Sequence, residues 1–303
     1  MQTGPMTTTQ NAPWIPEVIA NEAIGLLGAY LNLGATVRRD SELNPARVGQ
    51  VLSIPRRGVV EAQQKSQGTP NVIQRPVADD IQITVDQHWY VKLLEEDFTR
   101  SMQTDSTLPG YAEDGVIVLA EKIENNLISH ISEFDNIDAG GSDGDAYKGV
   151  VNVRKEMVKN KVPKLAQRFG YLSPGFYARL LKEEAVLDPK QLQGELARVE
   201  GIVGRTAGFN LFEGQLTPPS GSPAWDQNFF YTRNALVLAS RPLLAPGSEL
   251  GVQAATIQSE AGIALRVVRY YDGDEMGVVV QIDTVFGSGV NDERQGFVLE
   301  SQG

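Results

Sequence analysis

The chain has 303 residues, no cysteine and a formal net charge of −11 at pH 7. The missing cysteines exclude disulfides, thiolate metal sites and thiol nucleophiles, so stability must come from packing or from association. No apolar stretch approaches membrane-spanning length, and residues 1–12 lack the basic and apolar regions of a signal peptide. We therefore expect a soluble protein that has no membrane partner and is made and used in a cytoplasm.

The N-terminal part of the chain predicts a helix followed by an extended arm. Apolar residues recur at helical spacing after Pro16, and we expect Gly34 to end this helix. Two strand-like runs follow, residues 50–54 and 81–86, joined by a stretch with almost no apolar content. Such a long loop is uncommon inside a compact domain, and a two-stranded ribbon is marginally stable alone. We interpret residues 50–86 as an arm that reaches a neighbouring subunit; a mobile surface loop is the alternative.

Three basic residues of this arm are candidate contacts between subunits: Arg56, Arg57 and Lys65. A polar ribbon tip gains little from its own fold and much from charge-assisted hydrogen bonds across an interface. We expect these side chains to contact acidic or carbonyl groups of an adjacent subunit.

Two helices are predicted after the arm. Tyr90, Leu94, Phe98 and Met102 lie four residues apart, which predicts a helix that ends before residues 109–110. The next helix is stronger, because one apolar stripe lies opposite a polar side. The stripe consists of Val116, Leu119, Ala120, Ile123, Leu127, Ile131 and Phe134, and the polar side consists of Glu121, Lys122, Glu124 and Asn125.

The rest of the chain predicts a second region and a strand-rich end. A Gly- and Asp-rich stretch over residues 135–149 marks a boundary. Beyond it we expect a basic helix over residues 153–161, a short strand at residues 171–172 that leads into a helix ending at Leu181, and glycine turns within residues 201–209. Apolar residues alternate on both sides of Asp272 and Gly273, which predicts a long hairpin.

Charge is distributed unevenly along the chain. Residues 81–148 contain 14 acidic and 4 basic side chains, whereas residues 149–200 contain 10 basic and 6 acidic ones. An acidic surface binds nucleic acid poorly, because phosphate contacts need Lys and Arg to release counterions. The acidic tract fits a surface that faces confined DNA without adhering to it, and it also fits an ordinary solvated helix face. We expect the basic stretch over residues 154–164 to serve subunit contacts.

No motif in the sequence marks an active site. His88 and His130 lack a partner pattern, and the glycines between residues 201 and 208 match neither the dinucleotide fingerprint nor the phosphate-binding loop. The aspartates between residues 135 and 145 miss the spacing of a calcium-binding loop. We therefore expect no catalytic residue, no cofactor and no metal site.

Taken in order, these segments resemble the major capsid proteins of tailed bacteriophages, which have the Hong Kong 97 fold, and in particular the coat proteins of short-tailed phages. The resemblance rests on the order and spacing of several pieces. They are residues 51–55, 160–163, 172–174, 201–209, 235–239, 269–272 and 283–287, together with Arg168.

The resemblance implies an α+β capsid fold with five parts along the chain. These are an N-terminal arm and helix (residues 1–49), an extended β-hairpin loop (50–86), a peripheral domain with a long spine helix (87–148), an axial domain (149–260) and a β-hairpin that returns to the peripheral domain (261–303).

The resemblance also implies a structural protein and not an enzyme. Its subunits would form hexamers and pentamers and close an icosahedral shell around double-stranded DNA, which is enclosed without specific binding. The protein would be assembled in the host cell cytoplasm and would then be part of the virion. The few residues before Trp14 leave no room for a fused scaffolding domain, so we expect a separate scaffolding protein and a portal as partners. The alternatives are an encapsulin-like compartment and a hydrolase or binding domain with an unrecognised site.

Two finer expectations follow from such a shell. Acidic side chains on the polar side of the long helix, Glu121, Glu124, Glu133 and Asp135, would face the interior, where DNA would meet like charge and slide. Lys65 is the only Lys before residue 92 and hence the arm's only candidate for a covalent link to a neighbour. We expect the contact to be non-covalent.

Overall fold

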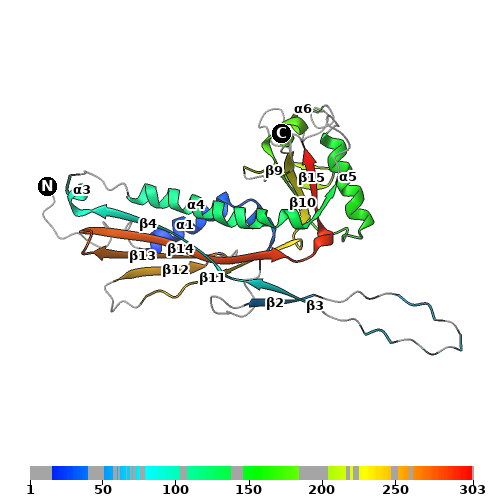
Figure 1. The fold of residues 1–303 in the computed structure, drawn as a ribbon, viewed down its shortest axis with the longest axis horizontal. Helices are drawn as coiled ribbons and strands as arrows, with labels where there is room; N and C mark the ends of the chain where they lie inside the picture. Colours follow the sequence, from blue (N-terminus) through cyan, green and yellow to red (C-terminus); the bar gives the residue numbers. More distant parts are fainter. Residues whose placement is uncertain are drawn as a thin grey trace.

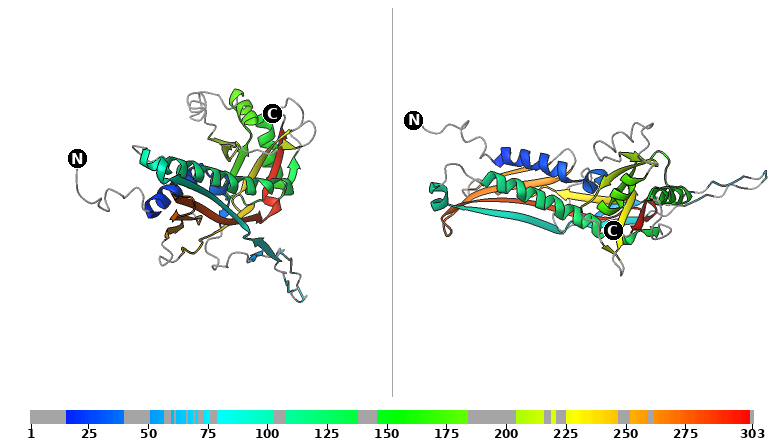
Figure 2. Two further views of the ribbon diagram at one scale, coloured as in Figure 1. Left: turned by 60° about the vertical axis from the view of Figure 1, so that its left-hand side comes forward. Right: turned by 90° about the horizontal axis from the view of Figure 1, so that it is seen from above.

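The computed structural model contains two packed units and an arm (Figure 1). The described residues are 16–39, 51–56, 79–102, 108–137, 146–183, 204–215, 219–220, 225–246, 252–258 and 262–301, with the arm pieces 60, 62–65, 67–68, 70 and 73–75. One unit is an elongated sheet with helices on one face, and the other is a compact sheet with its own helices (Figure 2).

In the described part of the chain, six strands form the elongated sheet, which is built around its longest strand, β14 (Gly277–Val290). The other strands are β1 (Arg38–Arg39), β4 (Gln87–Glu96), β11 (Leu236–Arg241), β12 (Gln253–Gln258) and β13 (Ala264–Asp272). Strands β13 and β14 form the predicted hairpin, in which the pair Asp272 and Gly277 encloses residues 273–276. Along its other edge β14 pairs with β4, from Gly277 opposite Glu96 to Phe286 opposite Gln87.

Two helices cover one face of this sheet, α1 (Pro16–Tyr30) and α4 (Leu108–Ser129). The apolar stripe predicted for the long helix is buried against the sheet and α1, but the helix ends at Ser129, and Ile131 and Phe134 lie in and after the turn that follows it. The helix begins at Leu108, earlier than expected, and residues 109–110 lie in its first turn. Proline is tolerated there because the first backbone N–H groups of a helix have no partner within the helix.

The helix predicted over residues 90–102 is wrong. Residues 87–96 form strand β4, and only α3 (Asp97–Met102) is helical. A spacing of four residues fits one face of a helix, but it also fits one face of a strand, where side chains alternate with a period of two. Val91 and Leu93 pack against the core, whereas Tyr90 and Leu94 remain 60% and 41% exposed. The apolar face inferred from the sequence is therefore the outer face of the strand.

The first helix ends earlier than predicted. Helix α1 stops at Tyr30, and Gly34 lies inside a separate short helix, α2 (Leu33–Thr36). The chain then enters β1, which pairs in parallel with β11.

Seven strands form the compact sheet, and its central strands are buried on both faces. They are β5 (Asp135–Ile137), β6 (Arg168–Leu172), β7 (Arg205–Thr206), β8 (Phe209–Glu213), β9 (Pro219–Ser220), β10 (Trp225–Thr232) and β15 (Gly296–Ser301). One face packs on α5 (Ala146–Lys159) and α6 (Pro174–Lys182), which correspond to the predicted basic helix and the predicted helix after residue 172. The other face belongs to the same core as α1 and α4.

The chain passes between the two sheets more than once. Strands β11 and β12, between residues 236 and 258, belong to the elongated sheet, whereas β15 belongs to the compact sheet. The chain therefore changes from one sheet to the other at residues other than 149 and 260, and the expected division into peripheral and axial domains remains a prediction.

Candidate functional site

The predicted arm has a two-stranded base that is anchored on the elongated sheet. Strands β2 (Val51–Arg56) and β3 (Asp79–Thr84) pair antiparallel, from Val51 opposite Thr84 to Arg56 opposite Asp79. Apolar side chains of this base are buried against β11 and β14 on the face of the sheet opposite α1 and α4. They are Leu52, Ile54, Ile83 and Val85 on the base and Val237, Ala239 and Val285 on the sheet. Both strands predicted from the sequence are confirmed.

A glycine allows the arm to cross the sheet. The Thr84 carbonyl oxygen lies directly against Gly287, and a Cβ atom at this glycine would sit 2.9 Å from the Cα of Val85. Real Cβ atoms essentially never come so close to backbone, so a side chain at residue 287 would push the base of the arm off the sheet.

Beyond its base the arm extends away from both units (Figures 1 and 2). Lys65 lies on this distal part and is exposed, and Val60 and Ile73 are 71% and 81% exposed. Of the other two candidate contact residues, Arg56 ends β2, while its side chain and all of Arg57 lie outside the described residues.

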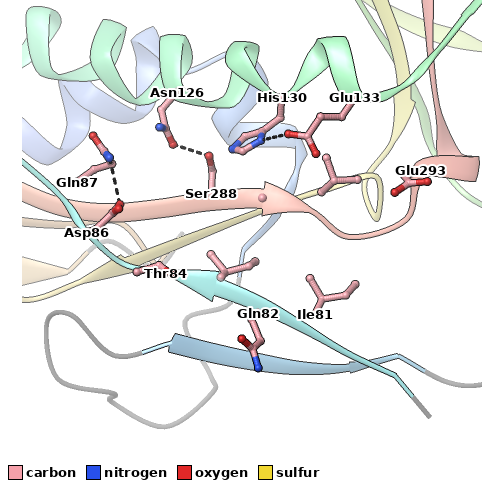
Figure 3. A pocket seen from close by; sticks show the side chains of 13 residues that line it. Ile81, Gln82, Thr84, Asp86, Gln87, Asn126, His130, Glu133, Ser288 and Glu293 are labelled. Carbon is pink, nitrogen blue, oxygen red and sulfur yellow. Dashed lines mark hydrogen bonds and ion pairs between the residues drawn. The ribbon is translucent and has the colours of Figure 1, made fainter. Parts of the chain in front are cut away.

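A groove of about 500 Å³ lies between the base of the arm, the end of α4 and the end of β14 (Figure 3). Its walls are residues 81–84 of β3, with Asp86 and Gln87, and residues 288–290 of β14. Asn126, His130, Glu133 and Glu293 complete the lining, and the first three project from the end of α4 and the turn that follows it.

The groove is acidic and polar. It contains three carboxylates, Asp86, Glu133 and Glu293, and within the described part of the chain no Lys or Arg lines it. Glu133 Oε1 lies 2.6 Å from His130 Nδ1, and Gln87 Nε2 donates to Asp86 Oδ1 at 3.1 Å. Ser288 donates to the side-chain oxygen of Asn126, which joins β14 to α4. The site therefore favours a cationic and hydrogen-bonding partner over an apolar one.

Open strand edges meet in this groove. Strand β4 pairs with β14 only as far as Phe286, so residues 288–290 are paired with β11 on one edge and, among the described residues, have no strand partner on the edge that faces the groove. Among the described strands, β3 pairs with β2 alone. Unpaired strand edges offer backbone N–H and C=O groups to an extended segment of another chain.

Glu124 does not belong to the outward-facing acidic surface, which corrects the expectation for this residue. Its side chain is buried, with 4% exposure, and accepts hydrogen bonds from the backbone N–H groups of Gly34 (3.0 Å) and Leu33 (3.3 Å). Burial raises the pKa of this carboxyl from 4.5 to about 7. The sequence held the signal, since Glu124 lies four residues after Ala120 and three before Leu127, on the apolar stripe. Glu121, Glu133 and Asp135 are exposed.

A second buried carboxylate, Asp283, was not identified from the sequence. It is fully buried on β14, and Arg266 contacts it with both Nε, at 2.9 Å, and Nη2. Gln281 Nε2 donates to it at 3.2 Å, and His88 Nε2 lies 3.4 Å away. The pairing explains the burial, because an unpaired charge would be costly there. His88 and His130 thus each have one acidic neighbour.

The other sequence candidates have structural roles or lie outside the described residues. Ala207 and Gly208, both with positive φ, form the turn between β7 and β8, so backbone turning explains that glycine. Among the described residues no group of three His, Asp or Glu side chains is placed to hold a metal ion; Asp138, Asp143 and Asp145 lie outside them. None of the helices in the described part of the chain has the length and apolar character needed to span a membrane.

The sequence matches no protein-family model and no curated protein. Solved structures, in contrast, match nearly the whole fold. The capsid of cyanophage P-SCSP1u matches with a TM-score of 0.60 and 14% identity, over 88% of this chain and 86% of that chain. The mature capsid of bacteriophage PhiM1 matches with a TM-score of 0.60 and 15% identity, over 88% and 85%. A virus-like particle from Pyrococcus furiosus matches with a TM-score of 0.54 and 12% identity, over 94% and 98%.

These comparisons establish the fold. The chain has the mixed helix and strand architecture of phage capsid proteins, which confirms the α+β capsid fold implied by the resemblance.

Proposed function

We propose that this chain, which has the fold of phage capsid proteins, is the major capsid protein of a tailed bacteriophage and assembles into the shell of the head. The observation that carries the proposal is the extent of the structural match, which covers 88% of this chain and 85% or more of each of the two phage capsid chains.

The structure of the arm supports a function in self-assembly. The base of the arm is packed on the sheet, which fixes the direction of the arm, while nearly all described residues of the distal part are exposed. Because the packed base holds the distal arm away from both sheets, the distal arm is suited to a contact with a neighbouring subunit. In this proposal Arg56, Arg57 and Lys65 make that contact without a covalent link.

The remaining partners follow from the same proposal. Subunits form hexamers and pentamers around double-stranded DNA, with a separate scaffolding protein and a portal, inside the host cytoplasm. The exposed carboxylates of Glu121 and Asp135 face the interior, where like charge keeps DNA from adhering. Glu133, which was expected to face the interior with them, is also exposed but lines the groove beside the arm. A density map with these two residues on the outer surface, or empty shells that bind DNA tightly at low salt, would contradict this orientation.

Electron microscopy of the purified protein tests the proposal. We expect closed shells with pentameric and hexameric units, and a preparation that contains only dispersed monomers would overturn it. A shell that encloses an enzyme would instead support the encapsulin-like alternative. The nucleic acid and protein content of the particles distinguishes the two.

A further inference from the structure

The groove beside the arm and the distal part of the arm have opposite charge. The groove presents three carboxylates on polar walls. The distal arm, residues 57–78, contains Arg57, Lys65 and Arg75 against a single acidic residue, Glu61, although the whole chain has a net charge of −11. Lys65 and Arg75 are both described and exposed.

The distal arm cannot easily bind in the groove of its own subunit. Strand β3 forms one wall of the groove (Figure 3), and the described pieces of the arm lie away from both units (Figure 1). With about eleven residues in each leg and a rise of about 3.3 Å per residue, the tip reaches about 35 Å beyond the base. To enter its own groove, the arm would have to reverse on itself. A second copy, displaced by less than the length of the arm, can receive the distal arm along its groove without a bend.

We propose that this acidic groove is the docking site for the distal arm of a second copy of the chain, so that Lys65 and Arg75 meet Glu133 and Glu293 of the neighbour. This inference rests on the proposed function and names the surface that the arm contacts. The open edges of β3 and of residues 288–290 add backbone hydrogen bonds for an extended segment, and the carboxylates select a basic one.

The basic helix α5 of a second copy is a less suitable segment to bind in the groove. A helix with its side chains is about 10 Å across, which suits an extended strand-edge groove poorly. Two of its basic groups are also engaged, since Arg154 donates to the Ala207 carbonyl at 2.8 Å and Lys159 donates to Glu156 at 2.6 Å.

Charge reversal tests the docking. The double variant Glu133→Lys with Glu293→Lys should reduce particle yield, measured by sedimentation, about tenfold or more, because each copy then presents like charges. Glu113→Lys with Glu121→Lys is the matched control, with the same charge change on exposed residues of α4 outside the groove. Equal particle yields for the groove and control variants would overturn the proposal.

Rescue separates docking from a general loss of folding. Adding Lys65→Glu and Arg75→Glu to the groove variant restores the charge match, so we expect most of the particle yield to return. Folded subunits, judged by circular dichroism, that fail to regain particles would overturn the proposal. Rescue by Lys155→Glu and Lys164→Glu instead of the arm pair would also overturn it, in favour of the basic stretch over residues 154–164.

Disulfide trapping gives a second, independent measurement. The chain has no cysteine, so Glu293→Cys combined with Lys65→Cys, and separately with Arg75→Cys, introduces a single defined pair. We expect oxidised particles of at least one pair to give a ladder on a non-reducing gel, and the unsubstituted protein to run singly near 33.0 kDa. Intact particles without a ladder for either pair would refute the docking, while the particles themselves would still uphold the proposed function.

Discussion

In the compact unit, strands β6 and β10 bury side chains on both faces, whereas nearly every described residue of the distal arm between 60 and 75 is exposed. The two regions belong to one chain, yet only the first contains the apolar burial that stabilises a fold. The base of the arm lies between these extremes, because one face of its ribbon packs on the sheet. The comparison suggests that substitutions should divide into those that unfold the subunit and those that affect only its association.

The largest expected effect is in the compact unit. Phe230 is fully buried and packs edge-on against Phe209, with ring centroids 5.2 Å apart. Phe230→Ala should lower the free energy of unfolding by about 3–5 kcal/mol, measured by chemical denaturation. Val60→Ala in the distal arm is the control and should change it by less than about 0.5 kcal/mol. Similar losses from both substitutions would mean that the arm is part of the folded core.

The pH dependence of stability should reveal Glu124, the buried carboxyl that joins α4 to α2. Its pKa is 4.5 ordinarily and about 7 in the folded chain, so the folded state binds the proton more tightly. Its contribution to stability is therefore fully present below pH 4.5 and is lost as the pH rises through about 7. Relative to Glu124→Gln, the native protein should lose on the order of 3 kcal/mol of unfolding free energy between pH 4 and pH 8. Parallel curves for the two proteins would contradict the assignment.

An intermediate effect is expected where the arm crosses the sheet. Gly287→Ala places a methyl group against the backbone of Thr84 and Val85 and should cost about 1–3 kcal/mol of stability. Gly289→Ala, on the same strand, is the matched control, because its Cβ would lie 3.3 Å from the movable Ile83 side chain. If both variants unfold at the same denaturant concentration, the close crossing does not restrict residue 287.

The smallest effect on stability belongs to the distal arm. Deletion of residues 58–68 removes no described buried side chain, so the unfolding free energy of the subunit should change by less than about 1 kcal/mol. Particle formation, followed by light scattering and microscopy, should nevertheless fail, because the shortened arm can no longer contact the neighbouring subunit. Normal particles from the deletion variant would show that the arm is dispensable.

Local patterns in the sequence predicted several elements of the structure, and pairing between distant segments explains the main failures. The stripe from Val116 to Phe134, the two strands at the base of the arm and the β13–β14 hairpin each depend on neighbouring residues. Strand β4 was missed because its pairing with β14 decides its conformation, and a four-residue spacing fits both structures. The groove could not be predicted, since its walls come from three separate parts of the chain.

The order in which the strands of the compact sheet occur along the chain has a consequence for the path of folding. Strand β15 lies between β5 and β10, and its residue Phe297 pairs both with Asp135 and with Phe230. The β5 side of this sheet therefore stays incomplete until residues 296–301 are available, and such non-local pairing is slow to form. The β2–β3 ribbon closes locally and can form earlier. We expect completion of the compact sheet to set the rate at which a newly synthesised subunit reaches its native state.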